Sequence, residues 1–119
     1  MSDLVRVAVD AMGGDYAPVE PVKGAIEAVN ADERVKVQLV GQVDVIEKEL
    51  QKYTYPKERV EIVPATEIIE TGEPPVNAIR HKKDSSIVVG MKKVRYGEAD
   101  AFVSSGSTGA VLVGGQTIV

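Results

Sequence analysis

The 119-residue sequence contains no cysteine, no tryptophan and a single histidine, and these absences exclude several kinds of catalytic site. Without cysteine the chain has no disulfide, no thiolate nucleophile and no Cys-ligated zinc site, and one histidine cannot build a multi-histidine metal centre. No apolar run reaches the ~18 residues of a membrane-spanning helix, and no secretory signal opens the sequence. With 44% hydrophobic residues, this length predicts one folded cytoplasmic domain.

Basic residues outnumber acidic residues in one segment, although the chain as a whole is acidic. The net charge is −4, yet residues 80–95 hold six basic residues against one acidic residue. Nucleic-acid binding needs an extended basic face, so this distribution argues against a nucleic-acid partner. It favours capture of a small anion or of an acidic protein, with a solvated helix face as the simpler alternative.

An alternation of β-rich and helical segments runs through the chain. Short β-branched or apolar runs at 5–9, 35–40, 60–63 and 101–103 predict strands, and apolar residues at helical spacing predict helices at 21–30, 43–53 and 85–96. Residues 64–84 are a less regular insertion, with a loop at 71–75 and a helical turn at 76–80, and form a candidate active-site loop. Because strands and helices alternate, the sequence predicts an α/β fold with a mainly parallel sheet and helices on both faces.

Helix-end signals mark two of these segments. Asp84 or Ser85 is the expected N-cap of the helix at 85–96, and Gly97 lies beyond its C-terminal end. A further apolar helix begins at Gly109 and needs a packing partner that we do not find in the sequence up to residue 119. We therefore expect a truncated chain, the N-terminal part of a single domain that lacks normal activity alone.

The loop after the first strand, Asp-Ala-Met-Gly-Gly-Asp at 10–15, is the first candidate site. Ligands of open α/β sheets bind at the carboxyl ends of the strands, and Gly13 and Gly14 would let the backbone approach one there, beside the carboxylate of Asp10. A tight turn in which Asp10 accepts backbone hydrogen bonds explains the pattern equally well. Magnesium binding by Asp10 and Asp15 is a weaker alternative.

The second candidate loop, Ser-Ser-Gly-Ser-Thr-Gly at 104–109, holds four hydroxyls and two glycines directly before a predicted helix. It matches neither a Walker A loop nor the glycine fingerprint of dinucleotide folds, which counts against ATP and NAD. N-capping needs only one hydroxyl, so four favour an anion site over an ordinary cap. Since both loops follow parallel strands, we expect them to face one cleft.

The basic segment supplies cations near a helix N-terminus. Arg80 can form a bidentate fork to phosphate oxygens and Lys83 can add a point charge. We expect Lys82 to be solvated and His81 to be a surface residue and not a general base. The cluster of Lys92, Lys93 and Arg95 is most simply explained by charges that match the helix dipole.

Three segments, taken in order, resemble the N-terminal part of the PlsX family of bacterial phosphate acyltransferases: residues 10–15 with Ala17-Pro18, residues 80–86, and residues 105–110. The resemblance spans essentially the whole chain, with Ser107 standing where the family usually has Asn. It implies a Rossmann-like fold related to phosphotransacetylases and to isocitrate and isopropylmalate dehydrogenases. It also implies transfer of a long-chain acyl group from acyl carrier protein to inorganic phosphate, giving acyl phosphate for phospholipid synthesis.

The resemblance further implies which residues form the site. Phosphate is itself the nucleophile, so no cofactor or metal is expected, and catalysis consists of alignment and charge stabilisation. Expected partners are acyl carrier protein, phosphate and a second copy in a homodimer, with peripheral attachment to the inner face of the membrane through downstream sequence. A non-catalytic carrier-binding module and a phosphotransacetylase-like enzyme acting on acyl-coenzyme A remain alternatives. The expected catalytic residues are Arg80, Lys83, Ser107 and Thr108, and the expected substrate-binding residues are Asp10, Gly13, Gly14, Ser85, Ser86, Gly106 and Gly109.

Overall fold

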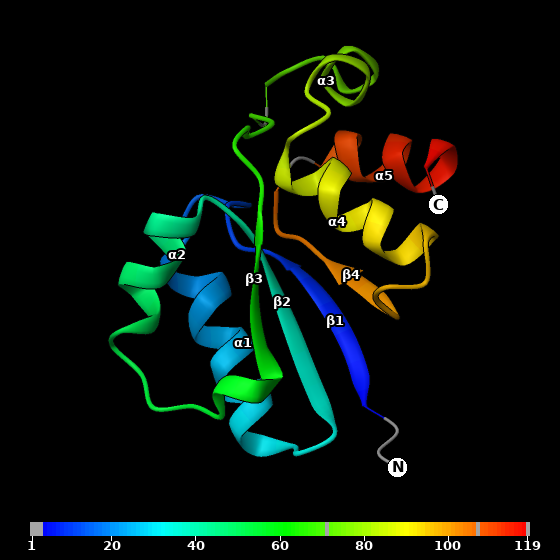
Figure 1. Ribbon diagram of the computed structural model, residues 1–119. Helices are drawn as coiled ribbons and strands as arrows, with labels where there is room; N and C mark the ends of the chain where they lie inside the picture. The colour runs from blue at the N-terminus through cyan, green and yellow to red at the C-terminus, as the bar shows by residue number, and fades with distance from the viewer. Residues whose placement is uncertain (1–3, 71, 107, 119) are drawn as a thin grey trace.

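The computed structural model describes residues 4–70, 72–106 and 108–118, which fold into a four-stranded sheet with helices around it (Figure 1). A 3₁₀ turn, Lys57–Arg59, precedes the third strand. None of the described helices is long and apolar enough to cross a membrane. The elements in chain order are β1 (Val5–Asp10), α1 (Val19–Ala31), β2 (Val35–Gly41), α2 (Val43–Leu50), β3 (Val60–Pro64), α3 (Pro75–His81), α4 (Ser86–Arg95), β4 (Ala101–Val103) and α5 (Thr108–Thr117).

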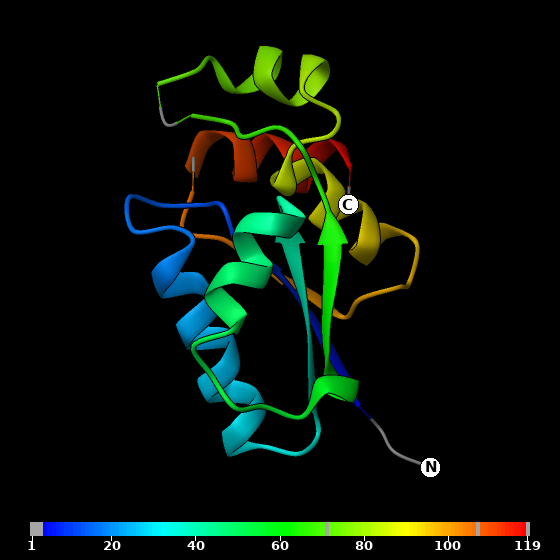
Figure 2. The same ribbon diagram turned by 60° about the vertical axis from the view of Figure 1, so that its left-hand side comes forward.

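The sheet has the strand order β3-β2-β1-β4, and all three neighbouring pairs are parallel. This order is that of the first four strands of a doubly wound Rossmann sheet. Helices α1 and α2 cover one face and α4 covers the other, while α5 lies between α4 and α3 beyond the carboxyl ends of the strands (Figures 1 and 2). The predicted α/β fold with helices on both faces is confirmed.

Alternation along the strands decides which side chains face which helices. In β2, Val37 and Leu39 belong to the core beneath α1 and α2, and Val40 belongs to the core on the α4 side. In β1, Ala8 likewise lies on the α4 side. Because successive strand residues point to opposite faces, Asp10 follows Ala8 onto that face, toward the start of α4.

Helix α4 has the ends that the sequence predicts. The hydroxyl of Ser85, the N-cap, accepts a hydrogen bond from the backbone N–H of Val88 at 3.2 Å. At the other end Gly97 has a φ of +74°, a left-handed conformation that glycine adopts without a Cβ penalty. The close approach of α4 to the sheet also depends on a glycine, because a Cβ on Gly90 would overlap the ring of Phe102 in β4.

Two helix boundaries differ from those that periodicity predicts. Helix α1 begins at Val19, which places Pro21 inside the first turn, where a missing N–H costs no helical hydrogen bond. Helix α2 ends at Leu50 and not near Tyr53. The Tyr53 N–H bonds to the Leu50 carbonyl in a turn, and its ring still packs against the core. An apolar residue after a helix end therefore looked like one more helical position.

Helix α5 corrects our expectation that the last apolar element has no packing partner in the chain. Ala110 is fully buried, in one cluster with Ala78 of α3 and with Ile87 and Met91 of α4. Small residues make this contact possible, since a Cβ on Gly114 would overlap the Met91 sulfur. One face of α5 is thus packed, while Leu112 on the helix is 63% exposed.

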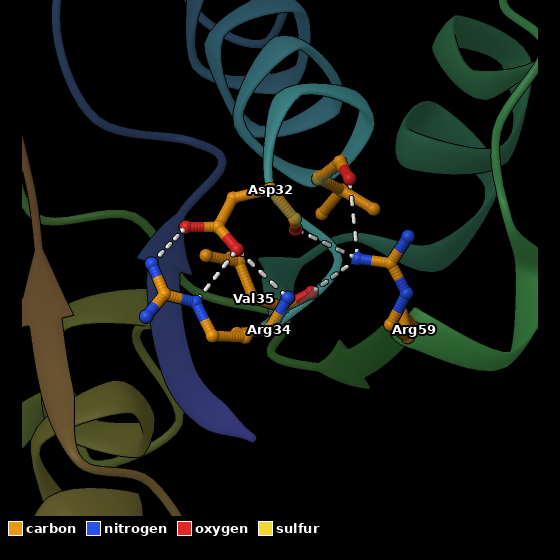
Figure 3. A network of polar contacts seen from close by, with 5 residues as sticks. Asp32, Arg34, Val35 and Arg59 are labelled. Atoms are coloured by element: carbon orange, nitrogen blue, oxygen red, sulfur yellow. Dashed lines mark hydrogen bonds and ion pairs between the residues drawn. The ribbon is translucent and has the colours of Figure 1, made fainter. Parts of the chain in front are cut away.

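Arg59 stabilises the connection between α1 and β2 (Figure 3). Its Nη1 donates hydrogen bonds to the backbone carbonyls of Val29, Asp32 and Val35, at 3.1, 3.0 and 2.9 Å. A cation is favourable there because carbonyls at the end of a helix have no helical partner. In the same turn, hydrogen bonds from the side chain and the backbone N–H of Arg34 lower the pKa of Asp32 to about 2.

Candidate functional site

The buried carboxylate of Asp10 is the centre of a polar cluster at the carboxyl edge of the sheet. Asp10 is the last residue of β1 and only 2% exposed. Its Oδ1 accepts from the Ser86 hydroxyl at 2.5 Å and from the Met12 N–H at 3.1 Å, and its Oδ2 accepts from the Ser104 hydroxyl at 2.7 Å. The carboxylate thereby joins the loop after β1, the first turn of α4 and the loop after β4, so the two candidate loops meet.

The glycines of the β1–α1 loop allow it to pack against the β4–α5 loop. A Cβ on Gly13 would overlap Asp10 Oδ2 and lie 3.0 Å from the Gly106 nitrogen. Gly14 has a φ of +91°, and a Cβ there would lie 3.1 Å from the Ser105 carbonyl oxygen. Gly13 and Gly14 thus let the β1–α1 loop approach a second loop, and the expected approach of their backbone to a ligand stays a prediction.

Of the two serines in the β4–α5 loop whose side chains the structure describes, Ser104 is hydrogen-bonded within the cluster. Ser104 donates its proton to Asp10, and its Oγ accepts the Gly106 N–H at 3.0 Å. Ser105 is exposed. Ser107 lies outside the described residues, and for Thr108 only the backbone, which begins α5, is described.

Arg80 and Lys83 are both exposed, and neither side chain forms a hydrogen bond or ion pair with any residue that the structure describes. Helix α3 lies along α5 so that Pro75 faces Gly109, with 2.5 Å from Pro75 Cγ to an added Cβ, and Ile79 faces Gly114. Arg80 therefore lies near the C-terminal end of α3, away from the start of α5. Ser85 and Ser86 are buried, one as N-cap and one on Asp10.

The expectation that Lys82 is solvated is wrong. Its Nζ donates to the Ile68 carbonyl at 2.8 Å and pairs with Glu73 Oε2 at 2.7 Å. This ammonium, together with the Glu70 N–H, holds the pKa of Glu73 below its usual value. Lys82 thus ties the end of α3 to the irregular segment before it. His81 is exposed, as expected of a surface residue.

Asp84 anchors the start of α4 to the chain that leaves β3. Its Oδ2 accepts from the Thr66 hydroxyl at 2.6 Å and from the Thr66 N–H at 3.0 Å, and these donors lower the pKa of the carboxyl. Close by, the Ser86 N–H bonds to the Glu67 carbonyl at 3.2 Å. Neither contact follows from a sequence motif, because Thr66 lies in the segment that lacks periodicity.

The basic residues at the end of α4 have specific partners besides the helix dipole. Lys93 pairs with Glu98 at 3.4 Å, and Arg95 donates to the Ile118 carbonyl at 2.6 Å, which links α4 to the end of α5. Lys92 is exposed. Charge at this helix end therefore contributes to packing of the last helix.

An apolar groove adjoins the Asp10 cluster. It has a volume of about 360 Å³ and reaches Asp10 and Ser104 at one end. Along its length it is lined mainly by small and β-branched side chains, among them Val7, Val9, Ala25, Ala28 and Val103. A second hollow of about 260 Å³, lined by Gly13, Gly14 and Tyr16, shares Ser105 with it.

The two carboxylates of the β1–α1 loop lie in different surroundings. Asp10 is buried, with a hydroxyl and an amide donor on Oδ1 and a hydroxyl donor on Oδ2, whereas Asp15 is exposed. Throughout residues 4–70, 72–106 and 108–118, no group of three or more Asp, Glu and His side chains is placed to hold a metal ion.

Comparison with known proteins gives consistent matches. A family model described as "Fatty acid synthesis protein" matches residues 5–119. The phosphate acyltransferase of Halothermothrix orenii is 47% identical over 111 residues, which cover 93% of this chain and 33% of that protein. Those of Alkaliphilus oremlandii and Syntrophomonas wolfei are 48% and 50% identical over 97% and 91% of this chain, and 34% of each relative is covered. The chain spans about a third of the length of these curated relatives.

Proposed function

The chain belongs to the fatty acid synthesis protein family, and on that premise we propose that the protein carrying it is a phosphate acyltransferase. Its reaction moves a long-chain acyl group from acyl carrier protein to inorganic phosphate for phospholipid synthesis. The observation that carries this proposal is the 47–50% identity, over more than nine-tenths of the chain, to proteins named phosphate acyltransferase. The hydroxyl-rich and glycine-rich loop before α5 supports an anion as one substrate.

The reaction needs positioned charge and no protein nucleophile. A phosphate oxygen attacks the thioester carbonyl carbon, the C–O bond forms as the C–S bond breaks, and the proton of hydrogen phosphate goes to the departing thiolate. We propose that backbone N–H groups at the start of α5, Ser107 and Thr108 hold phosphate. Arg80, whose backbone lies away from the start of α5, and Lys83 would supply positive charge by turning their exposed side chains toward the bound anion. Such groups lower the barrier by aligning the reactants and stabilising the oxyanion.

The apolar groove offers a surface for the acyl chain. It ends at Asp10 and Ser104, beside the loop that we assign to phosphate, so a chain lying in it would bring its thioester to that loop. Val7, Val9 and Val103 present apolar surface, and burying methylene groups against it is favourable by roughly 0.8 kcal/mol per CH₂. The groove therefore fits a substrate with an apolar tail and a reacting head.

Partners and location follow from the same proposal. Residues 80–95 carry the positive charge that an acidic carrier protein would meet, and we propose that the protein docks its carrier there, in the cytoplasm. Assembly as a homodimer and peripheral attachment to the inner face of the membrane complete the proposal.

The deciding experiment follows thiol release from long-chain acyl carrier protein by the complete protein, with and without phosphate. Phosphate-dependent release together with acyl phosphate formation is the expected result. Tight binding of the carrier without release would favour a carrier-binding module. Turnover of acyl-coenzyme A alone would favour a phosphotransacetylase-like enzyme.

The Arg80→Ala variant of the complete protein tests the cation that we assign to phosphate. A charge-assisted hydrogen bond is worth roughly 1.5–3 kcal/mol, so kcat/KM for phosphate should fall roughly ten- to hundred-fold. Lys48→Ala is the matched control, since Lys48 is an exposed base on α2 outside residues 80–95, and it should stay near wild type. Equal effects of the two substitutions, or none at Arg80, would place phosphate elsewhere.

A further inference from the structure

A buried carboxylate is an unfavourable neighbour for a phosphate. Asp10 is 2% exposed, and like charges repel more strongly where water is excluded. Yet Asp10 lies directly beneath the loop that leads into α5, joined to it through Ser104. We therefore look for a role of Asp10 other than direct contact with phosphate.

The hydrogen bonds around Ser104 indicate that role. A serine hydroxyl has one proton and two lone pairs, and here the proton goes to Asp10 Oδ2 while the oxygen accepts the Gly106 N–H at 3.0 Å. The carboxylate thus decides which way the hydroxyl points, and the hydroxyl in turn holds the backbone of the loop. Without that acceptor, the Ser104 proton is free to turn toward other partners.

The other oxygen of Asp10 is held just as firmly. Oδ1 accepts from Ser86, which is 2% exposed on the first turn of α4, and from the Met12 N–H. Gly13 packs against Oδ2 so closely that a Cβ would overlap it. The carboxylate consequently cannot rotate, and it transmits the position of α4 and of the β1–α1 loop to Ser104.

We propose that Asp10 is a positioning residue, which sets the conformation of the 104–106 backbone through Ser104 and does not itself contact phosphate. This proposal rests on the proposed function for its kinetic consequence. Its structural consequence, an ordered Gly106 amide, is independent of the reaction.

The test compares Asp10→Asn, Ser104→Ala and the double variant of the complete protein, with Lys48→Ala, at an exposed base on α2, as control. If Asp10 acts through Ser104, each single variant should raise the KM for phosphate roughly tenfold, the loss expected for one buried hydrogen bond, with the KM for acyl carrier protein unchanged. The double variant should resemble either single variant, because groups that act as one unit are not additive. Additive effects, or a wild-type KM in Ser104→Ala, would overturn the proposal.

Two further readouts separate positioning from other roles. The pH profile of kcat should survive Asp10→Asn, whereas loss of its acidic limb would make Asp10 a general base and overturn the proposal. Amide hydrogen exchange in peptides covering 104–106 should become faster in both Asp10→Asn and Ser104→Ala and stay unchanged in Lys48→Ala. This last measurement holds even if the wild-type protein shows no phosphate-dependent turnover, and unchanged exchange in both variants would refute positioning.

Discussion

Gly13 shows how much of the site depends on the lack of a single methyl group. Its Cα faces the Asp10 carboxylate and the Gly106 nitrogen, so the β1–α1 loop and the β4–α5 loop touch backbone to backbone. The carboxylate cannot move aside, because Ser86 and Ser104 hold its two oxygens. A larger residue at position 13 must therefore push the two loops apart.

We accordingly expect Gly13→Ala to destabilise the protein by roughly 1–3 kcal/mol, the usual effect of overpacking a fitted site. Urea unfolding at pH 7 measures this change. Gly72→Ala is the matched control, because a Cβ at Gly72 meets nothing within 4 Å, and it should change stability by less than about 0.5 kcal/mol. Equal stability of the two variants would mean that the loops separate without cost.

At this scale the sequence predicted some contacts and missed others for a clear reason. The meeting of Asp10 with Ser104 was predictable, because both follow parallel strands and parallel strands share a carboxyl edge. The bond from Ser86 to Asp10 depends on where α4 crosses the sheet. The pairing of Lys82 with Glu73 depends on the path of an irregular segment. The periodicity of the sequence predicts neither of these two contacts.

At the scale of elements, α1 forms one wall of the apolar groove with a face that carries small residues. Gly24 and Ala28 are exposed there, and a Cβ on Gly24 would meet nothing within 4 Å. The groove therefore has room for a ligand at Gly24, and replacing this glycine with another residue would also raise the helix propensity of α1.

Gly24→Leu separates these two effects. Leucine in place of glycine favours the helix, so the melting temperature should not fall, while its side chain fills the groove and should lower kcat/KM for long-chain acyl carrier protein roughly tenfold. A matched control is Gly115→Leu, a helical glycine with equal space on α5 but outside the groove, which should leave kcat/KM unchanged. Normal turnover by Gly24→Leu would show that the acyl chain does not bind in this groove.

Periodicity was a good guide to the existence of elements and a poor guide to their neighbours. The strands and the helices at α1, α2 and α4 were predicted from spacing alone, because each buries one face. The packing of α5 on α3 and α4 was missed, since α3 lies in the insertion that was read as a loop with one helical turn. A helix rich in small residues also shows no polar face from which its contacts could be deduced.

For the whole molecule, lowered carboxyl pKa values predict how stability depends on pH. Hydrogen bonds with Arg6 lower the pKa of Asp100, which links β1 to the segment before β4, and Arg34 lowers that of Asp32 to about 2. Thr66 lowers the pKa of Asp84, and Lys82 lowers the pKa of Glu73. Each of these carboxyls binds protons more readily when the chain is unfolded, so acid favours unfolding.

The stabilisation from these groups should be fully present above about pH 4, the range of free carboxyl pKa values, and should be lost as the pH falls toward about 2. Urea midpoints of the 119-residue chain at pH 7, 4 and 2.5 measure this loss. Asp32→Asn should flatten the fall between pH 4 and 2.5. As control, Asp15→Asn removes a carboxylate that makes no ion pair with a described residue, and it should leave the slope unchanged. A midpoint independent of pH would contradict the prediction.

The order in which a ribosome delivers the chain gives the Asp10 cluster a further consequence. Asp10 leaves the tunnel 76 residues before Ser86 and 94 residues before Ser104. Strands β1, β2 and β3 with α1 and α2 can pair from the first 64 residues, and N-terminal units of a growing chain fold first. During that interval the carboxylate stays hydrated at an open strand end, since neither serine has been made. The Asp10 carboxylate is therefore in place before the rest of the site. It loses its water only when α4 and β4 dock and bring Ser86 and Ser104 to it.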